Sequence, residues 1–167
     1  MRVPANYLDF IKKAQHYCDI IERRKELKTK QFLSEVLVAL LDLYRSGLFL
    51  SPIKKVKGIS CREITHPEWV KLFSSLVKKL GKKTHYSCAF DPTDLEEKEI
   101  TISNLADDLA DIYRDVKNSL NSINKDDIKH KRAALWYFHF NFFTHSSAHI
   151  SDAIRAIHYF EIDNKNI

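Results

Sequence analysis

Apolar residues recur at steps of three and four along five segments of the chain, the spacing that places them on one face of an α-helix. The first segment runs from about residue 4 to residue 25, and the second begins after Thr29 and ends near Gly47. Because the connection between these two segments is short, we expect the two helices to pair antiparallel. Gly47 is expected to end the second helix in a left-handed conformation.

Residues 48–64 contain Pro52, Gly58 and several lysines, a composition that predicts a basic surface loop. A third helix is expected to open at Thr65 and to end at Gly81. Thr65 and Glu68 have the three-residue spacing of a capping box, in which each side chain accepts a hydrogen bond from the other residue's backbone N–H.

Residues 82–102 show no regular pattern and are expected to be irregular, and Ser103 is expected to cap a fourth helix. The last helical pattern runs from about residue 127 to residue 160, with a kink or break expected at Ser146 and Ser147. Its aromatic residues are nearly continuous, so we expect it to be central and buried. The predicted fold is all-α, with residues 1–167 forming a single-domain bundle of about five helices and a long, central C-terminal helix.

The composition supports this fold and excludes several classes of site. The 167 residues include only three glycines and four prolines, too few for the tight turns of a barrel or for a Gly-rich phosphate loop. Cys18, Cys61 and Cys88 lack the CxxC spacing of zinc sites, and we expect them to be reduced thiols. Without a signal-peptide pattern or an apolar run long enough to span a bilayer, a cytoplasmic protein is expected.

Two histidines near the C-terminus are the strongest candidates for site chemistry. His145 and His149 are four residues apart on a helix, which places both imidazoles on one face. This is the histidine spacing of the HExxH zinc motif, although Ser-Ser-Ala stands between them here and supplies no glutamate. On the fourth helix, Asp108, Asp111 and Asp115 also share one face.

Two interpretations of this cluster stay open. We favour a hydrogen-bonded polar network of histidines and aspartates that holds no cofactor, because buried polar groups are usually satisfied in pairs. The alternative is a metal-dependent or acid–base enzyme, whose metal ligands would be Asp107, Asp111, His145 and His149.

The net charge is +5, with residues 1–85 basic and residues 86–167 acidic. A nucleic-acid-binding adaptor that uses the basic half is therefore a second alternative. The aromatic run from Trp136 to Phe140 is expected to pack in the core, since a helix does not present its rings as one flat stacking platform. Nucleic acid is consequently an unlikely partner.

Three stretches resemble a family of small all-helical bacterial proteins of unknown function. They are Tyr86 to Pro92, the run Asp-Asp-Leu-Ala-Asp-Ile-Tyr-Arg-Asp at residues 107–115, and Trp136-x-Phe-x-Phe-x-Phe-x-x-His-x-x-x-His ending at His149. The resemblance implies an all-helical fold and bacterial origin, and it implies no known reaction. By analogy of size and style alone, such proteins are similar to the immunity proteins of contact-dependent inhibition and related toxin systems.

The function expected from the sequence is therefore that of an immunity protein or antitoxin, not an enzyme, which occludes the active site of a cognate protein toxin. A basic nuclease toxin would be attracted by an acidic face, because opposite potentials speed association. The acidic residues assigned to this face are Glu96, Glu97, Glu99, Asp126 and Asp127.

Overall fold

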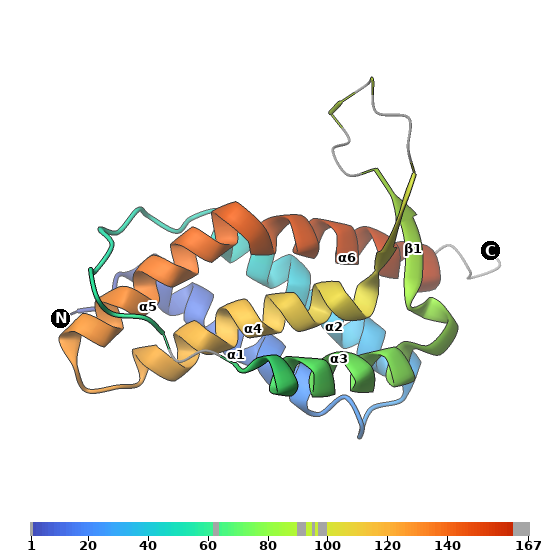
Figure 1. Ribbon diagram of the computed structural model, residues 1–167, viewed down its shortest axis with the longest axis horizontal. Helices are drawn as coiled ribbons and strands as arrows, with labels where there is room; N and C mark the ends of the chain where they lie inside the picture. The colour runs from blue at the N-terminus through green and yellow to red at the C-terminus, as the bar shows by residue number, and fades with distance from the viewer. Residues whose placement is uncertain (1, 62–63, 90–92, 95, 97–99, 162–167) are drawn as a thin grey trace.

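The computed structural model describes residues 2–61, 64–89, 93–94, 96 and 100–161, and six α-helices make up most of them (Figure 1). The helices are α1 (Ala5–Glu22), α2 (Thr29–Gly47), α3 (His66–Leu80), α4 (Leu105–Ile123), α5 (Ile128–Asn141) and α6 (Ser147–Glu161). A π-helical turn, Phe142–Ser146, joins α5 to α6, so that these two helices continue one another along the bundle. The expected all-α bundle with a long C-terminal helical element is confirmed.

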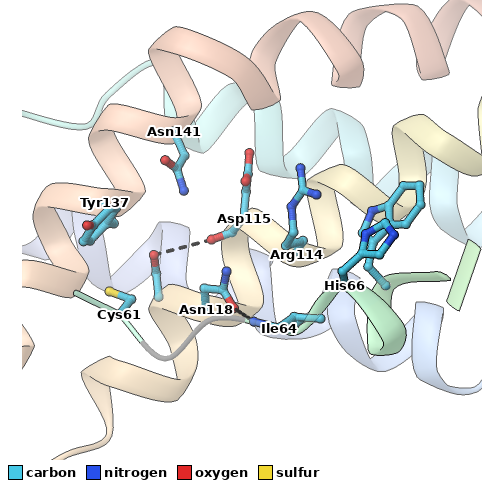
Figure 2. A pocket seen from close by; sticks show the side chains of 10 residues that line it. Cys61, Ile64, His66, Arg114, Asp115, Asn118, Tyr137 and Asn141 are labelled. Carbon is cyan, nitrogen blue, oxygen red and sulfur yellow. Dashed lines mark hydrogen bonds between the residues drawn. The ribbon is translucent and has the colours of Figure 1, made fainter. Parts of the chain in front are cut away.

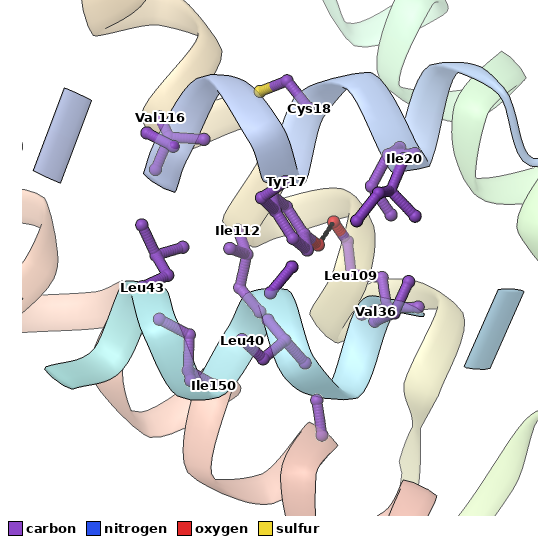
Figure 3. Packing of buried hydrophobic residues seen from close by; sticks show 14 of the residues in the cluster. Tyr17, Cys18, Ile20, Val36, Leu40, Leu43, Leu109, Ile112, Val116 and Ile150 are labelled. Carbon is purple, nitrogen blue, oxygen red and sulfur yellow. Dashed lines mark hydrogen bonds between the residues drawn. The ribbon is translucent and has the colours of Figure 1, made fainter. Parts of the chain in front are cut away.

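The core lies between α1, α2, α4 and α6. The antiparallel pair α1 and α2 packs against α6 and α4, and α4 also contacts α3 and α5 (Figure 1). Tyr17 on α1 is fully buried, and its hydroxyl donates a 2.8 Å hydrogen bond to the carbonyl of Leu109 on α4 (Figure 3). This bond satisfies the one polar atom of a large core side chain and fixes α1 against α4.

The end of α2 differs from the expectation. Gly47 is the last residue of α2 and has no positive φ, so it is not a left-handed stop. Its lack of a side chain serves packing instead, because a Cβ at this position would lie 2.1 Å from Cε2 of Phe142. The absence of this methyl group lets the Phe142 ring of the π-helical turn lie directly on α2.

The third helix begins and ends as predicted. Thr65 Oγ1 accepts from the N–H of Glu68, and a Glu68 carboxylate oxygen accepts from the N–H of Thr65 at 2.8 Å, which completes the capping box. Gly81 follows the helix with a φ of +56°, a conformation that glycine adopts without steric cost.

The segment expected to be irregular contains a hairpin. Strand β1 (His85–Cys88) pairs antiparallel with β2 (Thr101–Asn104), with His85 opposite Asn104. Ser103 therefore lies in a strand, where its hydroxyl contacts the Cys88 thiol, and it does not cap α4. Asn104 does so instead, since its Oδ1 accepts from the N–H groups of Ala106 and Asp107.

The aromatic run of α5 is only partly buried, contrary to the expectation. Phe138 and Phe142 are in the core, but Phe140 and Phe143 are 43% and 48% exposed. The reason is geometric: consecutive aromatic residues point in all directions around a helix, and α5 packs closely against α4 on one side. Among the described residues, no helix combines the length and hydrophobicity needed to cross a membrane.

Candidate metal centre

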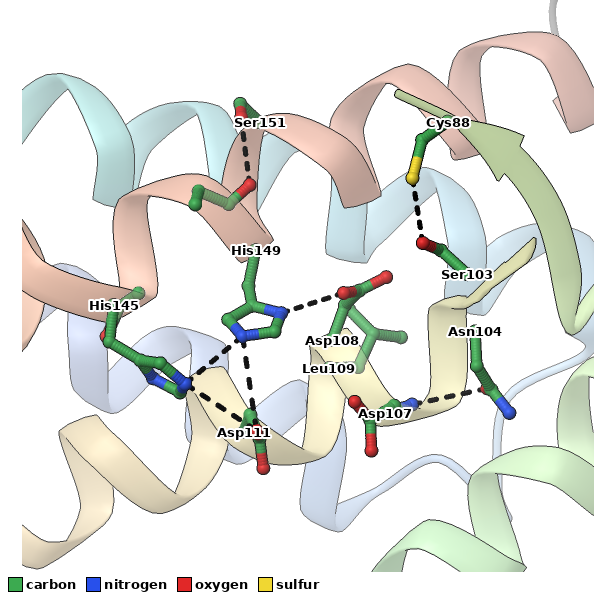
Figure 4. Close-up of polar contacts among 12 residues, drawn as sticks. Cys88, Ser103, Asn104, Asp107, Asp108, Leu109, Asp111, His145, His149 and Ser151 are labelled. Atoms are coloured by element: carbon green, nitrogen blue, oxygen red, sulfur yellow. Dashed lines mark hydrogen bonds and ion pairs between the residues drawn. The ribbon is translucent and has the colours of Figure 1, made fainter. Parts of the chain in front are cut away.

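Two aspartates on α4, Asp108 and Asp111, face two histidines on the neighbouring C-terminal segment (Figure 4), and a third aspartate of α4 contacts one of these histidines. Asp108, Asp111 and Asp115 recur at steps of three and four, which places them on one side of α4. His145 lies in the π-helical turn and His149 in the first turns of α6. Since α4 packs against both segments, the five side chains meet in one polar cluster.

Each imidazole is held at Nδ1 by its own aspartate. His145 Nδ1 lies 2.8 Å from Asp115 Oδ2, and His149 Nδ1 lies 2.8 Å from Asp108 Oδ1. A carboxylate can only accept a hydrogen bond, so the proton of each neutral ring is on Nδ1. When both rings are neutral, each Nε2 atom carries a lone pair, and when one ring takes up a second proton its Nε2 can donate to the Nε2 of the other ring.

The two Nε2 atoms converge on one oxygen of Asp111. They lie 3.2 Å from each other, and Asp111 Oδ2 lies 3.8 Å from that of His145 and 4.0 Å from that of His149. In a tetrahedral site with bonds of about 2.0–2.1 Å, neighbouring ligand atoms are about 3.3 Å apart. The nitrogen pair already has this spacing, and the carboxylate oxygen needs to move inward by only a fraction of an ångström.

The other oxygen of Asp111 is held from outside the cluster. Trp69 on α3 donates its indole N–H to Asp111 Oδ1 at 2.7 Å, and the Arg114 guanidinium pairs with the same oxygen at 3.0 Å. These contacts orient the carboxylate so that Oδ2 faces the two imidazoles.

The aspartates that hold the histidines are themselves held. Tyr86 on β1 donates to Asp108 Oδ2 at 2.7 Å, and Ser146 donates to Asp115 Oδ2 at 2.6 Å. Ser146 belongs to the π-helical turn, a rare distortion that occurs frequently at functional sites. The turn places His145 and Ser146, which are adjacent in sequence, on the same carboxylate.

Burial and charge differ across the cluster. The side chains of Asp111, His149 and His145 are 13%, 24% and 40% exposed, so the cluster is open to solvent on the His145 side. The hydrogen bond that His149 donates to Asp108 raises the pKa of His149 against the opposing effect of burial. Burial, with the charges of Asp111 and Asp108, raises the pKa of Asp107, and burial with the charge of Asp108 raises that of Asp152.

Two cavities flank the cluster. The first, about 380 Å³, lies between α3, α4 and α5 and includes Trp69, Arg114 and Asp115 in its wall (Figure 2). The second, about 430 Å³, lies beneath the hairpin and is lined by His149 and by three acidic residues, Asp107, Asp108 and Asp152. The first cavity therefore borders the cluster at Asp115, and the second borders it at Asp108 and His149.

The predicted ligand set is brought together except for Asp107. Its carboxylate points away from the two rings in Figure 4, and the three groups whose ligand atoms converge are Asp111, His145 and His149. The roles of Trp69 and Tyr86 were not predicted, because these residues come from α3 and β1, whose packing on α4 no local pattern reveals. The hydrogen bonds of the expected polar network are present between the histidines and Asp108 and Asp115.

The acidic residues assigned to toxin binding do not form one described face. Asp126 and Asp127 follow the C-terminal end of α4, whereas Glu96 lies in the connection between β1 and β2 at the opposite end of that helix (Figure 1). A helix of this length spans nearly 30 Å. Glu97 and Glu99 lie outside the described residues, and Asp127 caps α5 through the N–H groups of Lys129 and His130.

The fold has a counterpart among solved structures. The crystal structure of protein BF1032 from Bacteroides fragilis superposes with a TM-score of 0.84, covers 98% of this chain and 96% of its own, and is 23% identical in sequence. No curated protein matches. A model of the family described as a domain of unknown function, DUF5063, matches residues 2–163. The chain therefore belongs to the DUF5063 family.

Proposed function

We propose that the protein binds a divalent transition-metal ion through Asp111 Oδ2 and the Nε2 atoms of His145 and His149, and that it is a metal-dependent enzyme. One observation carries the proposal. Two lone pairs and one anionic oxygen point at a common centre, while the remaining polar atom of each of these side chains is held by another residue.

The position of Asp111 favours a metal ion over a proton shared by the two rings. The 3.2 Å between the Nε2 atoms fits such a proton, but the resulting imidazolium would also be drawn onto Asp111. Instead, Asp111 Oδ2 is 3.8 and 4.0 Å from the rings, beyond hydrogen-bond distance. The three atoms surround a space at the centre of the triangle, where a cation would offset their mutual repulsion.

The outer hydrogen bonds also support a metal ion. Histidines that bind metals usually donate their second ring N–H to a carboxylate, which fixes the ring and makes Nε2 a better ligand. Both histidines have such a carboxylate, at 2.8 Å in each case. A purely structural network would need only one aspartate for each ring and Asp111 Oδ1 for Trp69 and Arg114, so the position of Asp111 Oδ2 beside both rings goes beyond what such a network requires.

The number of ligands favours catalysis over a structural metal. Structural zinc sites are usually closed by four protein ligands, whereas catalytic sites offer three and leave a position for water or substrate. Two imidazoles and one carboxylate suit Zn²⁺ and Fe²⁺. With His145 40% exposed, the open positions are within reach of solvent. An ion held by Asp111, His145 and His149 would supply Lewis-acid chemistry and would lower the pKa of a water molecule for hydrolytic reactions.

Metal analysis of protein purified without a histidine tag tests the proposal. We expect a near-stoichiometric transition metal in the unaltered chain and its loss in His145→Ala and His149→Ala. His158→Ala is the matched control, because His158 is exposed on the same helix. Removal of the metal with a chelator should lower the melting temperature of the unaltered chain and of His158→Ala, but not that of the two site variants. Equal metal content in the control and the two site variants would refute the site.

The variant Asp111→Asn distinguishes a bound metal ion from a proton shared by the two imidazoles. The asparagine amide can donate to an Nε2 lone pair, so this variant should fold at least as well as metal-free protein while binding no metal. Full metal binding by the folded variant would show that Asp111 is not a ligand.

An immunity or antitoxin function stays a prediction. It needs a cognate toxin as partner and an acidic face, and the described acidic residues Glu96, Asp126 and Asp127 lie at two ends of the bundle. The metal centre is the better-supported proposal because it depends on contacts within the chain.

A further inference from the structure

The cavity between α3, α4 and α5 is bounded by hydrogen-bond donors that come from different elements. Arg114 and Asn118 project from α4 and Asn141 from the end of α5, and all three side chains point into the same space in Figure 2. We infer that this cavity binds the anionic end of a small ligand, a carboxylate or a phosphate. The inference depends on the proposed function only for the role of that ligand as a substrate.

The orientation of the Asn118 amide is fixed by the backbone. Its Oδ1 accepts the N–H of Ile64 at 2.7 Å, and an N–H needs an oxygen opposite it. The Nδ2 group, with two protons to donate, must therefore occupy the other position, which faces the cavity in Figure 2.

Arg114 supplies the charge. One edge of its guanidinium pairs with Asp111 at 3.0 Å, and its side chain is still 35% exposed at the cavity wall. A guanidinium has five donors in a planar fork, so the pairing with Asp111 leaves donors for an oxyanion. The one carboxylate of the described lining, Asp115, is turned to His145 and Ser146.

The two cavities differ in charge. We therefore expect an anion to bind in the cavity at Arg114 and not in the cavity under the hairpin. The cavity under the hairpin has Asp107, Asp108 and Asp152 in its wall and repels anions. The cavity at Arg114 is about 380 Å³, enough for a small metabolite whose uncharged part packs on Trp69 or Tyr137.

The cavity adjoins the metal centre through shared side chains. Trp69 and Arg114 hold the ligand Asp111, and Asp115 holds the ligand His145. A molecule anchored at Asn118 and Asn141 therefore lies against the residues that orient the metal ligands.

Calorimetric titration with inorganic phosphate and with acetate tests the inference, on chelator-treated and on zinc-loaded protein. Because the donors belong to the chain, we expect at least one of the two anions to bind the metal-free form. Which of the two binds more tightly identifies the anionic group that the cavity selects. Binding of neither anion to either form would overturn the inference.

Asn141→Asp and Asn118→Asp replace a donor amide by an anion, and the aspartate at 118 still offers an oxygen to Ile64. Each should weaken anion binding about tenfold or more, as loss of a donor with added repulsion does. Asn124→Asp, exposed at the end of α4, adds the same charge away from the cavity and should have no effect. Circular dichroism and metal content should be unchanged in all three variants.

The outcomes separate this inference from the proposed function. If anions bind only the zinc-loaded protein, and equally well in Asn118→Asp and Asn141→Asp, the ion alone holds the anion. That result would overturn the inference that the cavity binds anions but would leave the metal centre standing. Anion binding that both variants weaken, in a protein that holds no metal, would support the cavity and refute the metal centre.

Discussion

His145 and His149 bring their Nε2 atoms within 3.2 Å of each other, while Asp115 and Asp108 hold the opposite sides of the two rings. The aspartates are seven residues apart on α4, and the histidines are four residues apart on the facing segment. The earlier aspartate contacts the later histidine and the later aspartate contacts the earlier one, because the two segments run antiparallel. The ring orientation is therefore set before any ligand binds, which is the condition for a tight and selective metal site.

Loss of either outer carboxylate should weaken metal binding without removing a ligand. Asp108→Asn and Asp115→Asn keep the side-chain shape but lose the charge that fixes the Nδ1 proton, and we expect an affinity loss of about 10- to 100-fold. Competition with a chromophoric chelator measures this affinity. Asp152→Asn is the control, because Asp152 lies in the same acidic cavity. An equal loss in all three variants would mean that general charge, not orientation of the rings, matters.

Gly47 should tolerate no side chain while Phe142 is present. A Cβ at residue 47 would lie 2.1 Å from the Phe142 ring, so Gly47→Ala should destabilise the fold by about 1–3 kcal/mol through overpacking. Phe142→Leu makes room for the methyl group at the cost of a smaller core side chain. Urea unfolding of both single variants and the double variant should show a double-variant loss below the sum of the two. Strict additivity would contradict the contact.

The sequence predicted most helices because their signals are local. Apolar spacing located α1 and α2, and the Thr65–Glu68 capping box located the start of α3. The hairpin was missed because its strands are four residues each and their stability depends on pairing across a long connection. Gly47 was misinterpreted because its role depends on Phe142, which is distant in sequence.

The candidate site was predicted in part for the same reason. Helical spacing grouped His145 with His149 and placed Asp111 on a shared face, and the structure brings these three together. Sequence spacing could not choose between Asp107 and Asp108, because that choice depends on how α4 is rotated against α6. Trp69 is 42 residues from Asp111, and no pattern within either helix indicates their contact.

Tyr7 should make the fold sensitive to alkaline pH. Its ring is fully buried, its hydroxyl donates to the carbonyl of Ser51 at 2.6 Å, and burial raises its pKa to about 12. In the unfolded chain the phenol loses its proton near pH 10, earlier than in the folded chain. The stabilisation is thus complete below pH 10 and is lost as the pH rises from 10 to 12.

Tyr7→Phe tests this effect. The variant loses one hydrogen bond, so it should be less stable than the unaltered chain at pH 8 by about 1 kcal/mol. Its stability should then decline less steeply above pH 10, and the two unfolding curves should converge. Parallel decline of both proteins would show that Tyr7 does not contribute to the alkaline loss.

Asp127 should stabilise the fold as the cap of α5, and Asp126 should not. Asp127 Oδ1 accepts from the N–H of Lys129 at 3.1 Å, and its Oδ2 lies 2.5 Å from His130 Nδ1. The hydrogen bond with His130 is the first cause of a lowered Asp127 pKa. A carboxyl with a lowered pKa stabilises the fold above its unfolded-state value and loses this effect as the pH falls through its folded-state value.

Asp127→Ala should therefore lower the melting temperature at pH 7, and the difference from the unaltered chain should shrink as the pH falls through the lowered folded-state pKa of Asp127. Asp126→Ala, next to it and exposed, should melt as the unaltered chain does at neutral and at acidic pH. This contrast also bears on partner binding at the α4–α5 turn. A loss of partner affinity in Asp126→Ala would reflect a direct contact, whereas the same loss in Asp127→Ala alone would follow from fraying of α5.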